Sequence, residues 1–309
     1  MKVLITGVNG LLGQKLLSIF CKNKDCSFDI VAVSRGRARF DGSYKQLKYY
    51  DLDITHREQV FNIIHLEKPD VIIHAAAMTN VDYCESHQED CWEVNVQSVV
   101  HMLQAAEAYN SFFVHLSSDF VFAGDKRFLT EEDKPHPINF YGQSKFQAEK
   151  FVLKSRVPHA VIRTAVVYGI AHKMSRSNII FWVKRNLEDG KSIRVVDDQY
   201  RSPTLAEDLA TGCYLIVQKQ STGIYNIAGG EVLTPYEMAI KIADYFGLDK
   251  SLITRTDASE FVQPAKRPLE TGLVIDKAKF ELGYQPHSFD QGVAILASQL
   301  DEEYCLTKG

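Results

Sequence analysis

Hydrophobic and polar positions in the first half of the chain switch repeatedly between two periods. Short apolar runs bounded by turn residues predict strands at Lys2–Thr6, Asp29–Val33, Val71–His74, Phe112–Leu116 and Ala160–Arg163. Apolar residues at helical spacing separate these strands, first at Leu12, Leu16, Leu17 and Phe20, and then across residues 56–67 and 90–109. Strands that alternate with helices in this way predict parallel β-α-β units, and therefore an α/β fold with a doubly wound parallel sheet.

The alternation loosens after residue 165. The pattern there predicts further elements, which are a helix at Ile179–Glu188, a strand at Ile193–Val196, a helix ending at Gln218, a strand at Ile224–Ile227, and amphipathic helices at Glu237–Phe246 and Phe289–Glu302. We therefore expect a dinucleotide-binding Rossmann domain over residues 1–165, with a returning segment at about 203–228. Residues 166–202 and 229–309 are expected to form a small, mostly helical C-terminal lobe that binds substrate beside the sheet.

Composition and charge exclude several classes of partner. The chain has 309 residues, a net charge of −4 and a pI near 6.2, so it lacks the basic footprint of a nucleic-acid-binding protein. It has neither an apolar run of membrane-spanning length nor a signal-peptide pattern, so we expect a cytoplasmic protein without a membrane partner. Its six cysteines have no metal-site spacing, which predicts reduced thiols and no metal site.

A glycine-rich turn follows the first predicted strand. Gly7, Gly10 and Gly13 are spaced three apart between that strand and the first helix. Glycines here let backbone N–H groups approach a pyrophosphate, and the helix N-terminus adds favourable partial charge. A plain turn is the alternative, but the position after the first strand favours cofactor binding.

The end of the second strand bears on the choice of cofactor. NAD-binding enzymes place a carboxylate here for the ribose 2′-hydroxyl, whereas an arginine suits a 2′-phosphate. This chain has Ser34 and Arg35, followed by Arg37, so we expect NADP, with NADPH preferred over NADH. A solvated arginine loop is the alternative.

Two further strand ends are candidate walls of the cofactor site. Residues 49–54 end the third strand and are expected near the adenine. The fourth strand opens into Ala75, Ala76 and Ala77, followed by Thr79, where small residues let the chain pass close to a cofactor or, alternatively, only pack tightly.

The candidate chemistry lies between Phe113 and Lys150. Tyr141 and Lys145 are four apart in a helical pattern, so they share one face of a helix. A nearby ammonium is expected to lower the pKa of a phenol toward the working range, so that Tyr141 can protonate the alkoxide formed when a hydride reaches a ketone. Ser118 is expected to add a hydrogen bond to the same oxygen. The alternative is an ordinary pair on a helix surface.

With these residues in place, the chain resembles the extended short-chain dehydrogenase/reductase family, and within it the dTDP-4-dehydrorhamnose reductase branch, nearly end to end. The resemblance rests on the turn Gly7–Gly13, residues 68–77, the segment Ser117–Phe122, the pair Tyr141 and Lys145, residues Gln199, Tyr200, Pro203 and Thr204, and Lys266-Arg267-Pro268. It implies reduction, with NADPH, of the 4-keto group of a nucleotide-activated deoxysugar, as in dTDP-L-rhamnose biosynthesis. A homodimer is one option for its assembly.

The resemblance also implies roles for individual residues. Tyr141 would donate the proton, Lys145 would hold the nicotinamide ribose, and Ser118 and Asp119 would contact the sugar. Further expected cofactor contacts are Gly10, Leu11, Leu12, Ala75, Ala76, Ala77 and Thr79, with Asp51 and Leu52 near the adenine. Arg267 would lie near the nucleotide diphosphate, where a guanidinium suits phosphate oxygens; a solvated surface arginine is the alternative.

Two departures from this branch keep other functions open. Val166 stands where many members have a tryptophan that packs on the sugar, and Arg201 stands where many have glycine. An arginine at this position also resembles the regulatory β-subunit of methionine adenosyltransferase, so a non-catalytic cofactor-binding subunit is a second hypothesis. An NAD-dependent sugar-nucleotide epimerase or dehydratase is a third, against which stand Phe120 after Asp119 and the Ser34-Arg35 pair.

Overall fold

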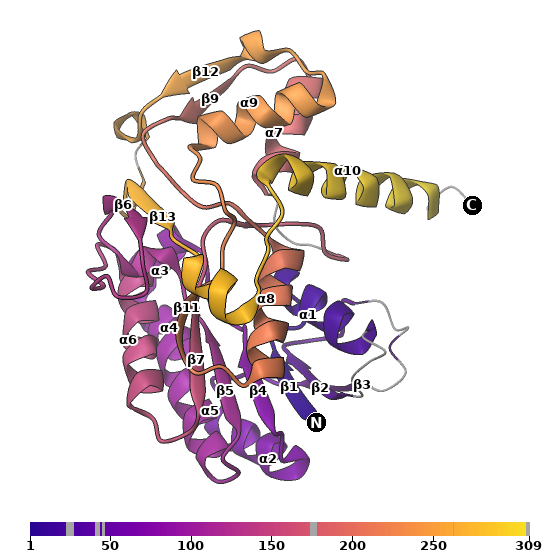
Figure 1. Ribbon diagram of the computed structural model, residues 1–309, viewed down its shortest axis with the longest axis vertical. Coiled ribbons are helices and arrows are strands. Elements are labelled where there is room, and N and C mark those ends of the chain that lie inside the picture. The colour runs from indigo at the N-terminus through magenta and orange to yellow at the C-terminus, as the bar shows by residue number, and fades with distance from the viewer. Residues whose placement is uncertain (23–27, 41–43, 45–46, 174–177, 262, 307–309) are drawn as a thin grey trace.

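A seven-stranded parallel sheet forms the core of the lower part of the molecule as drawn in Figure 1. The computed structural model describes residues 1–22, 28–40, 44, 47–173, 178–261 and 263–306. The strands lie in the order β11-β7-β5-β4-β1-β2-β3. Their bounds are β1 (Lys2–Thr6), β2 (Asp29–Ser34), β3 (Leu47–Asp51), β4 (Val71–His74), β5 (Phe112–Leu116), β7 (His159–Arg163) and β11 (Gly223–Asn226). The predicted doubly wound sheet is confirmed.

Helices cover both faces of the sheet. One face carries α1 (Leu11–Lys22) and α8 (Ala206–Lys219), and the other carries α2 (Arg57–Glu67), α5 (Ser98–Glu107) and α6 (Phe140–Lys154).

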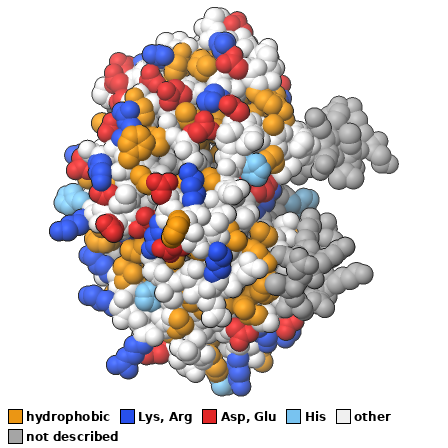
Figure 2. Space-filling model, in the orientation of Figure 1, with side chains coloured by type: hydrophobic (Ala, Val, Ile, Leu, Met, Phe, Trp, Pro, Cys, Tyr) orange, Lys and Arg blue, Asp and Glu red, His pale blue; other side chains and the backbone are white. Residues whose placement is uncertain are grey.

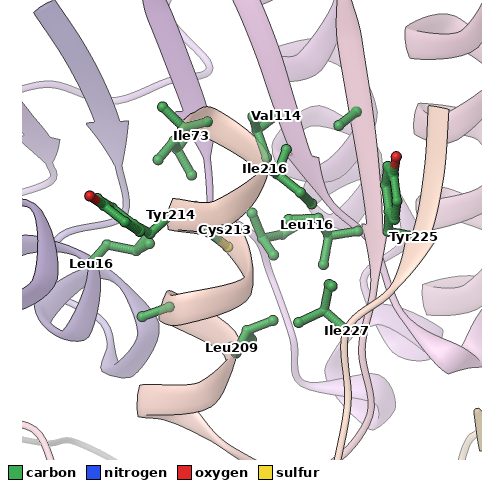
Figure 3. Close-up of a cluster of buried hydrophobic side chains, with 14 of the residues drawn as sticks. Leu16, Ile73, Val114, Leu116, Leu209, Cys213, Tyr214, Ile216, Tyr225 and Ile227 are labelled. Atoms are coloured by element: carbon green, nitrogen blue, oxygen red, sulfur yellow. The ribbon is translucent and has the colours of Figure 1, made fainter. Parts of the chain in front are cut away.

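Successive side chains of β1 therefore enter different cores. Val3 and Ile5 join the cluster under α1 and α8, while Leu4 joins the cluster under α2, α5 and α6. Figure 3 shows the first cluster, where Leu209, Cys213 and Ile216 of α8 point toward Val114 and Leu116 of β5. Burial on both faces explains why the strands read as continuous apolar runs.

A second hydrophobic unit lies beyond the ends of the strands (upper part of Figure 1). It contains α7 (Ile179–Glu188), α9 (Pro235–Phe246), α10 (Phe289–Leu306) and the parallel pair β9 (Ile193–Val196) and β12 (Ile253–Thr256). Its core includes Val183, Met238, Ile242 and Val293. Leu273 and Ala278 pack instead with the sheet core, so the chain returns to the sheet a second time, and the exact domain division stays a proposal.

Several elements escape the periodicity. They are the short helices α3 (Val81–Ser86) and α4 (Gln88–Trp92), the π-helical turn η1 (Glu93–Gln97), the 3-10 turns η2 (Asp119–Val121), η3 (Lys250–Leu252) and η4 (Ala258–Glu260), the π-helical turn η5 (Ala278–Leu282), and the paired short strands β6 (Asp125–Leu129) with β13 (Glu270–Leu273) and β8 (Val167–Tyr168) with β10 (Thr204–Leu205). The helix predicted at residues 90–109 is thus α4, η1 and α5 in succession. The third strand ends at Asp51, earlier than the predicted strand end at residues 49–54.

Lysine and arginine side chains are interspersed with aspartate and glutamate over the face shown in Figure 2. Among the described residues, no helix combines the length and the apolar character needed to cross a membrane.

Candidate active site

The sheet order reverses direction between β1 and β4. From β1 the chain proceeds to β2 and β3 on one side, and from β4 it proceeds to β5 and β7 on the other. Ligands of open α/β sheets bind at such a switch point, outside the carboxyl ends of the strands. The turn Gly7–Gly13 follows β1 and the segment Ala75–Thr79 follows β4, so the structure brings these two predicted cofactor segments together.

The glycine turn is packed too tightly for side chains. Gly7 has a φ of +74°, and a Cβ there would lie 2.9 Å from the backbone of Ala76. A Cβ on Gly13 would lie 2.2 Å from the carbonyl oxygen of Gly7. Helix α1 begins at Leu11, directly after Gly10, so its first N–H groups have no intrahelical acceptor and remain available to phosphate oxygens. The turn fits a dinucleotide pyrophosphate.

Asn9, which the sequence analysis passed over, fixes the arginine loop beside this turn. Its side-chain nitrogen donates to the carbonyl oxygens of Arg35 at 3.0 Å and Arg37 at 3.1 Å, and its oxygen accepts from the backbone of Arg39 at 2.8 Å. The side chain of Arg35 is 71% exposed, with a guanidinium nitrogen 3.7 Å from the carboxylate of Asp53. The loop therefore has a fixed backbone and a cationic side chain with room to turn toward a ligand.

Asp51 and Leu52, the two predicted adenine contacts, are held in different ways. A carboxylate oxygen of Asp51 accepts from the backbone N–H of Gly36 at 2.7 Å, and so helps to fix the same loop beside Ser34. The side chain of Leu52 is only 3% exposed and packs in the core under α2 and α5, and its backbone N–H donates to the carbonyl oxygen of Ser34 at 3.0 Å. Adenine contact by these two residues remains a prediction.

The segment after β4 is tied to both neighbouring layers. The backbone N–H of Ala76 donates to Oγ1 of Thr6 at 3.1 Å. The side chain of Asn95 accepts from the backbone of Met78 at 2.8 Å and donates to Oγ of Ser144 at 3.0 Å. Asn95 lies in η1 and is 1% exposed. It was missed in the sequence, where a single asparagine inside a helical pattern was the one available signal.

Ala75, Ala76 and Ala77 are half-buried in this segment, and Thr79 is exposed at its end. Cofactor contact by these four residues remains a prediction.

Helix α6 brings Tyr141 and Lys145 to the same buried face. Asn139 begins the helix by accepting from the backbone N–H of Gly142 at 2.8 Å. Tyr141 is 8% exposed and Lys145 is 3% exposed. A Cβ on Gly142 would lie 2.1 Å from the carbonyl oxygen of Phe120, so the missing side chain lets α6 approach the segment that carries Ser118.

Burial dominates the acidity of both groups. Burial raises the pKa of Tyr141 well above its usual value, hydrogen bonding with Ser118 opposes the shift, and the charge of Asp119 adds to it. Burial lowers the pKa of Lys145 to about 8, against the charge of Glu149. The net shift in the pKa of Tyr141 is opposite to the one that the Tyr-Lys spacing predicts, because burial of the phenol is the largest cause. At neutral pH Tyr141 is therefore a phenol, the form that can give a proton away.

Asp119 is enclosed within the protein, although the resemblance places it on the sugar. It is 2% exposed and accepts from the hydroxyls of Ser118 at 3.0 Å and Thr271 at 2.6 Å. Nε of Arg201 lies 3.8 Å from its second oxygen. Asp119 is therefore bound mainly by groups of the protein itself, and its expected contact with a sugar remains a prediction.

Arg267 is neither a solvated arginine nor a free one. Its guanidinium donates to both carboxylate oxygens of Asp82, at 2.8 and 2.7 Å, and its side chain is 16% exposed. The backbone oxygen of the preceding Lys266 accepts from the side chain of Asn139, which begins the helix of Tyr141. To reach a diphosphate, Arg267 has to exchange the carboxylate of Asp82 for phosphate.

Val166 is exposed and strained. It has a φ of +40°, which is unfavourable for a β-branched residue, and 37% of its side chain is exposed. Its carbonyl oxygen accepts from the backbone of Thr204 at 3.1 Å. Its role as a substrate contact remains a prediction.

Two buried histidines beneath the site were also missed. The rings of His74 on β4 and His115 on β5 stack with centroids 6.0 Å apart and planes 16° apart. Burial, and then the charge of Lys145, lower the pKa of His74 to about 3, so this ring is neutral beside the ammonium.

The sequence and the fold of the chain are similar to those of known proteins. The chain is 33% identical to the β-subunit of methionine adenosyltransferase 2 from Bos taurus over 86% of its own length and 78% of that protein. It is 30% identical to the dTDP-4-dehydrorhamnose reductase of Aggregatibacter actinomycetemcomitans, over 94% of this chain and 97% of that one. Among solved structures, the dTDP-4-dehydrorhamnose reductase of Bacillus anthracis in complex with NADP superposes with a TM-score of 0.82 at 26% identity, covering 96% of this chain and 99% of that one. The model of the RmlD substrate binding domain matches residues 1–302, and the chain therefore belongs to that family.

Proposed function

We propose that the protein reduces the 4-keto group of a nucleotide-activated deoxysugar with NADPH, and that Tyr141 donates the proton. The observation that carries this proposal is the placement of a buried, protonated Tyr141 beside Ser118 and in one apolar cluster with Met78, which lies in the segment after β4. The reductase from Bacillus anthracis that was solved with NADP has the same fold. Together these support a hydride acceptor held between the strand ends and the second hydrophobic unit.

The residues at the switch point fit a dinucleotide. The turn Gly7–Gly13 and the first N–H groups of α1 would hold the pyrophosphate, Arg35 would face the 2′-phosphate, and Lys145 would hold the nicotinamide ribose. When bound, NADPH supplies the hydride.

The chain's own contribution is to hold and deliver a proton. Tyr141 keeps its proton at neutral pH because burial disfavours the phenolate. Lys145 remains mostly charged at pH 7, since its pKa of about 8 lies above that value. Its charge can therefore stabilise negative charge that develops at the phenol oxygen as the proton leaves.

The test of this proposal is turnover by purified protein. NADPH oxidation should depend on dTDP-4-dehydrorhamnose, and Tyr141→Phe should lower kcat by roughly 10²–10⁴-fold. Tyr245→Phe is the matched control, because Tyr245 is exposed on α9, in the second hydrophobic unit, where its ring contacts Phe246. Equal kcat values in the two variants would show that Tyr141 is not the proton donor.

The cofactor preference has a separate test. Arg35→Ala should reduce the ratio of kcat/KM for NADPH to that for NADH by about tenfold, since a charge-assisted hydrogen bond contributes roughly 1.5–3 kcal/mol. Arg194→Ala removes an exposed arginine of the second unit and should leave the ratio unchanged. An unchanged ratio in Arg35→Ala would show that Arg35 does not contact the cofactor.

A regulatory subunit is the second candidate function. The identity of 33% to a methionine adenosyltransferase β-subunit favours it, as does Arg201, which is fully integrated into the interior. Under this proposal the protein binds NADP and a catalytic adenosyltransferase, and turns over no keto sugar. A stable complex with that enzyme on size-exclusion chromatography, together with no NADPH oxidation by a panel of nucleotide keto sugars, would decide for it.

A further inference from the structure

The carboxamide of Asn9 joins the glycine turn to the arginine loop, which is residues 35–39 after β2. Its nitrogen Nδ2 donates to the carbonyl oxygen of Arg35 at 3.0 Å and to that of Arg37 at 3.1 Å. Its oxygen Oδ1 accepts from the backbone N–H of Arg39 at 2.8 Å. The side chains of all three arginines are exposed. One half-buried side chain in the glycine turn therefore holds the backbone of three exposed cations.

The hydrogen bonds to the loop use both donor hydrogens of Asn9. A carboxamide nitrogen carries two hydrogens, and two carbonyl oxygens of the arginine loop accept them. The hydroxyl of Tyr49 lies 3.4 Å from the same nitrogen, which is a longer third contact. The partners also fix the orientation of the amide, because the two carbonyl oxygens need donors and the N–H of Arg39 needs an acceptor. The side chain of Asn9 thus acts on a ligand through the arginine loop and not by donating to it.

Two side chains of β3 hold the same loop as well. A carboxylate oxygen of Asp51 accepts from the backbone N–H of Gly36 at 2.7 Å. The hydroxyl of Tyr49 faces the carbonyl oxygen of Ser34 at 3.2 Å and also that of Gly36. Among the described residues, no heavy atom lies within 4 Å of a Cβ added to Gly36. The backbone of the loop is therefore fixed by the glycine turn and by β3, while the space beside Gly36 stays open.

A fixed loop backbone favours a ligand that binds the arginine side chains. Ordering a loose loop during binding costs free energy for each residue that becomes fixed, so a loop that is already ordered binds its ligand more tightly. The side chain of Arg35 keeps its freedom, since it is 71% exposed and lies 3.7 Å from the carboxylate of Asp53. A phosphate on the ribose 2′ position can accept charge-assisted hydrogen bonds from a guanidinium, and a 2′-hydroxyl gains much less.

We propose that Asn9 is a positioning residue for the choice of cofactor. By holding the backbone of the arginine loop, Asn9 raises the affinity for a dinucleotide that carries a 2′-phosphate and leaves the affinity for one with a 2′-hydroxyl nearly unchanged. Arg35 supplies the charge, and Asn9 fixes the backbone from which that charge extends. This role rests on the proposed use of NADPH, but it does not require that the protein turn over a sugar.

Binding of cofactor to the purified protein tests this role without turnover. Isothermal titration calorimetry gives the dissociation constants of NADPH and NADH for the wild type and for Asn9→Ala. The ratio of the NADH constant to the NADPH constant should fall by about tenfold, or about 1.4 kcal/mol, because NADPH then has to order the loop as it binds. Asn186→Ala is the matched control, since Asn186 donates to the carbonyl oxygen of Trp182 within α7, and it should keep the wild-type ratio. An unchanged ratio in Asn9→Ala would overturn the proposal, and so would an equal loss of affinity for both dinucleotides.

Asn9→Ser separates the proposed role from that of an ordinary turn residue. Serine also favours turns, but its short hydroxyl has one donor hydrogen and cannot replace the three hydrogen bonds of the carboxamide. Asn9→Ser should therefore show the same reduced ratio as Asn9→Ala. A wild-type ratio in Asn9→Ser would overturn the proposal, because turn formation alone would then set the preference.

Tyr49→Phe tests whether the order of the loop is what carries the preference. The variant keeps the ring that packs on Phe40 and removes only the hydroxyl that faces the loop. The ratio should fall in the same direction as in Asn9→Ala, by a smaller factor. A wild-type ratio in Tyr49→Phe would contradict the proposed mechanism.

Hydrogen exchange follows the loop in the protein without cofactor. The backbone N–H of Arg39 should exchange about tenfold faster in Asn9→Ala, since its hydrogen bond to Asn9 is lost. Unchanged exchange at Arg39 would overturn the proposal. Binding of NADPH without turnover of any keto sugar would remove the proposed reductase and leave the role of Asn9 intact. If neither dinucleotide binds, the proposed cofactor and its dependence on Asn9 both fail.

Discussion

Gly142→Ala tests the contact that brings Tyr141 to Ser118. The added Cβ would lie 2.1 Å from the carbonyl oxygen of Phe120. Carbon–oxygen contacts normally lie at about 3.3 Å or more, so α6 and the Phe120 segment must separate by about 1 Å. A misplacement of this size can cost about 100-fold in rate. Overpacking costs about 1–3 kcal/mol of stability and the loss of a helical glycine returns up to about 1 kcal/mol, so the variant should still fold.

The assay compares kcat/KM for NADPH-dependent reduction with the free energy of unfolding in urea. We expect Gly142→Ala to lose about 100-fold in kcat/KM while it keeps most of its stability. Gly230→Ala is the matched control, because a Cβ there would meet only Ile275 and Pro286 at 4.0 Å. Wild-type turnover in Gly142→Ala would refute the reasoning, since it would show that the approach of α6 to Phe120 does not position the catalytic groups.

Three further predictions concern buried charges. Arg163→Met leaves Glu149, which is 0% exposed and bound by the guanidinium at 2.8 and 3.0 Å, without its cation, so the free energy of unfolding should fall by about 3–5 kcal/mol, and adding Glu149→Leu should recover most of it. Burial raises the pKa of Glu67, but hydrogen bonds from one tyrosine and two lysines lower it to about 2, below its usual value of 4.5. The ionised form of Glu67 therefore stabilises the fold at pH values above the unfolded pKa. Glu67→Gln should lower the free energy of unfolding in urea by about 1–2 kcal/mol at pH 7, and this loss should disappear as the pH falls from 4.5 to about 2. A loss of stability that persists at low pH would contradict this. Burial lowers the pKa of Lys145 from 10.5 to about 8, so the charge of Lys145 destabilises the fold below pH 8, and this effect fades between pH 8 and pH 10.5. Lys145→Met should therefore raise the free energy of unfolding at pH 7 by about 1–3 kcal/mol and abolish reduction. A Lys145→Met variant that is less stable than the wild type would contradict this.

The central sheet could be predicted from the sequence because its strands are buried on both faces and its helices keep strong periodicity. The two cofactor segments could be placed as well, since a glycine turn after β1 and small residues after β4 must meet at the switch point. Short strands such as β6 and β13 escaped prediction, because their pairing joins residues more than a hundred positions apart.

The chemistry of the site was predicted less completely. Helical spacing correctly places Tyr141 and Lys145 on one face, but it says nothing about depth, and burial reverses the expected shift in the pKa of Tyr141. The hydrogen bond between Thr271 and Asp119 spans 152 positions, so no local pattern indicates it. The same holds for Asn95, whose partners lie in two other elements.

The most direct test of the central claim is the oxidation of NADPH by purified protein in the presence of dTDP-4-dehydrorhamnose, measured for the wild type and for Tyr141→Phe. The account predicts turnover that depends on the sugar nucleotide and is largely lost when the phenol hydroxyl is removed. Folded wild-type protein that binds NADPH and reduces no nucleotide keto sugar, or a Tyr141→Phe variant with the wild-type rate, would contradict it.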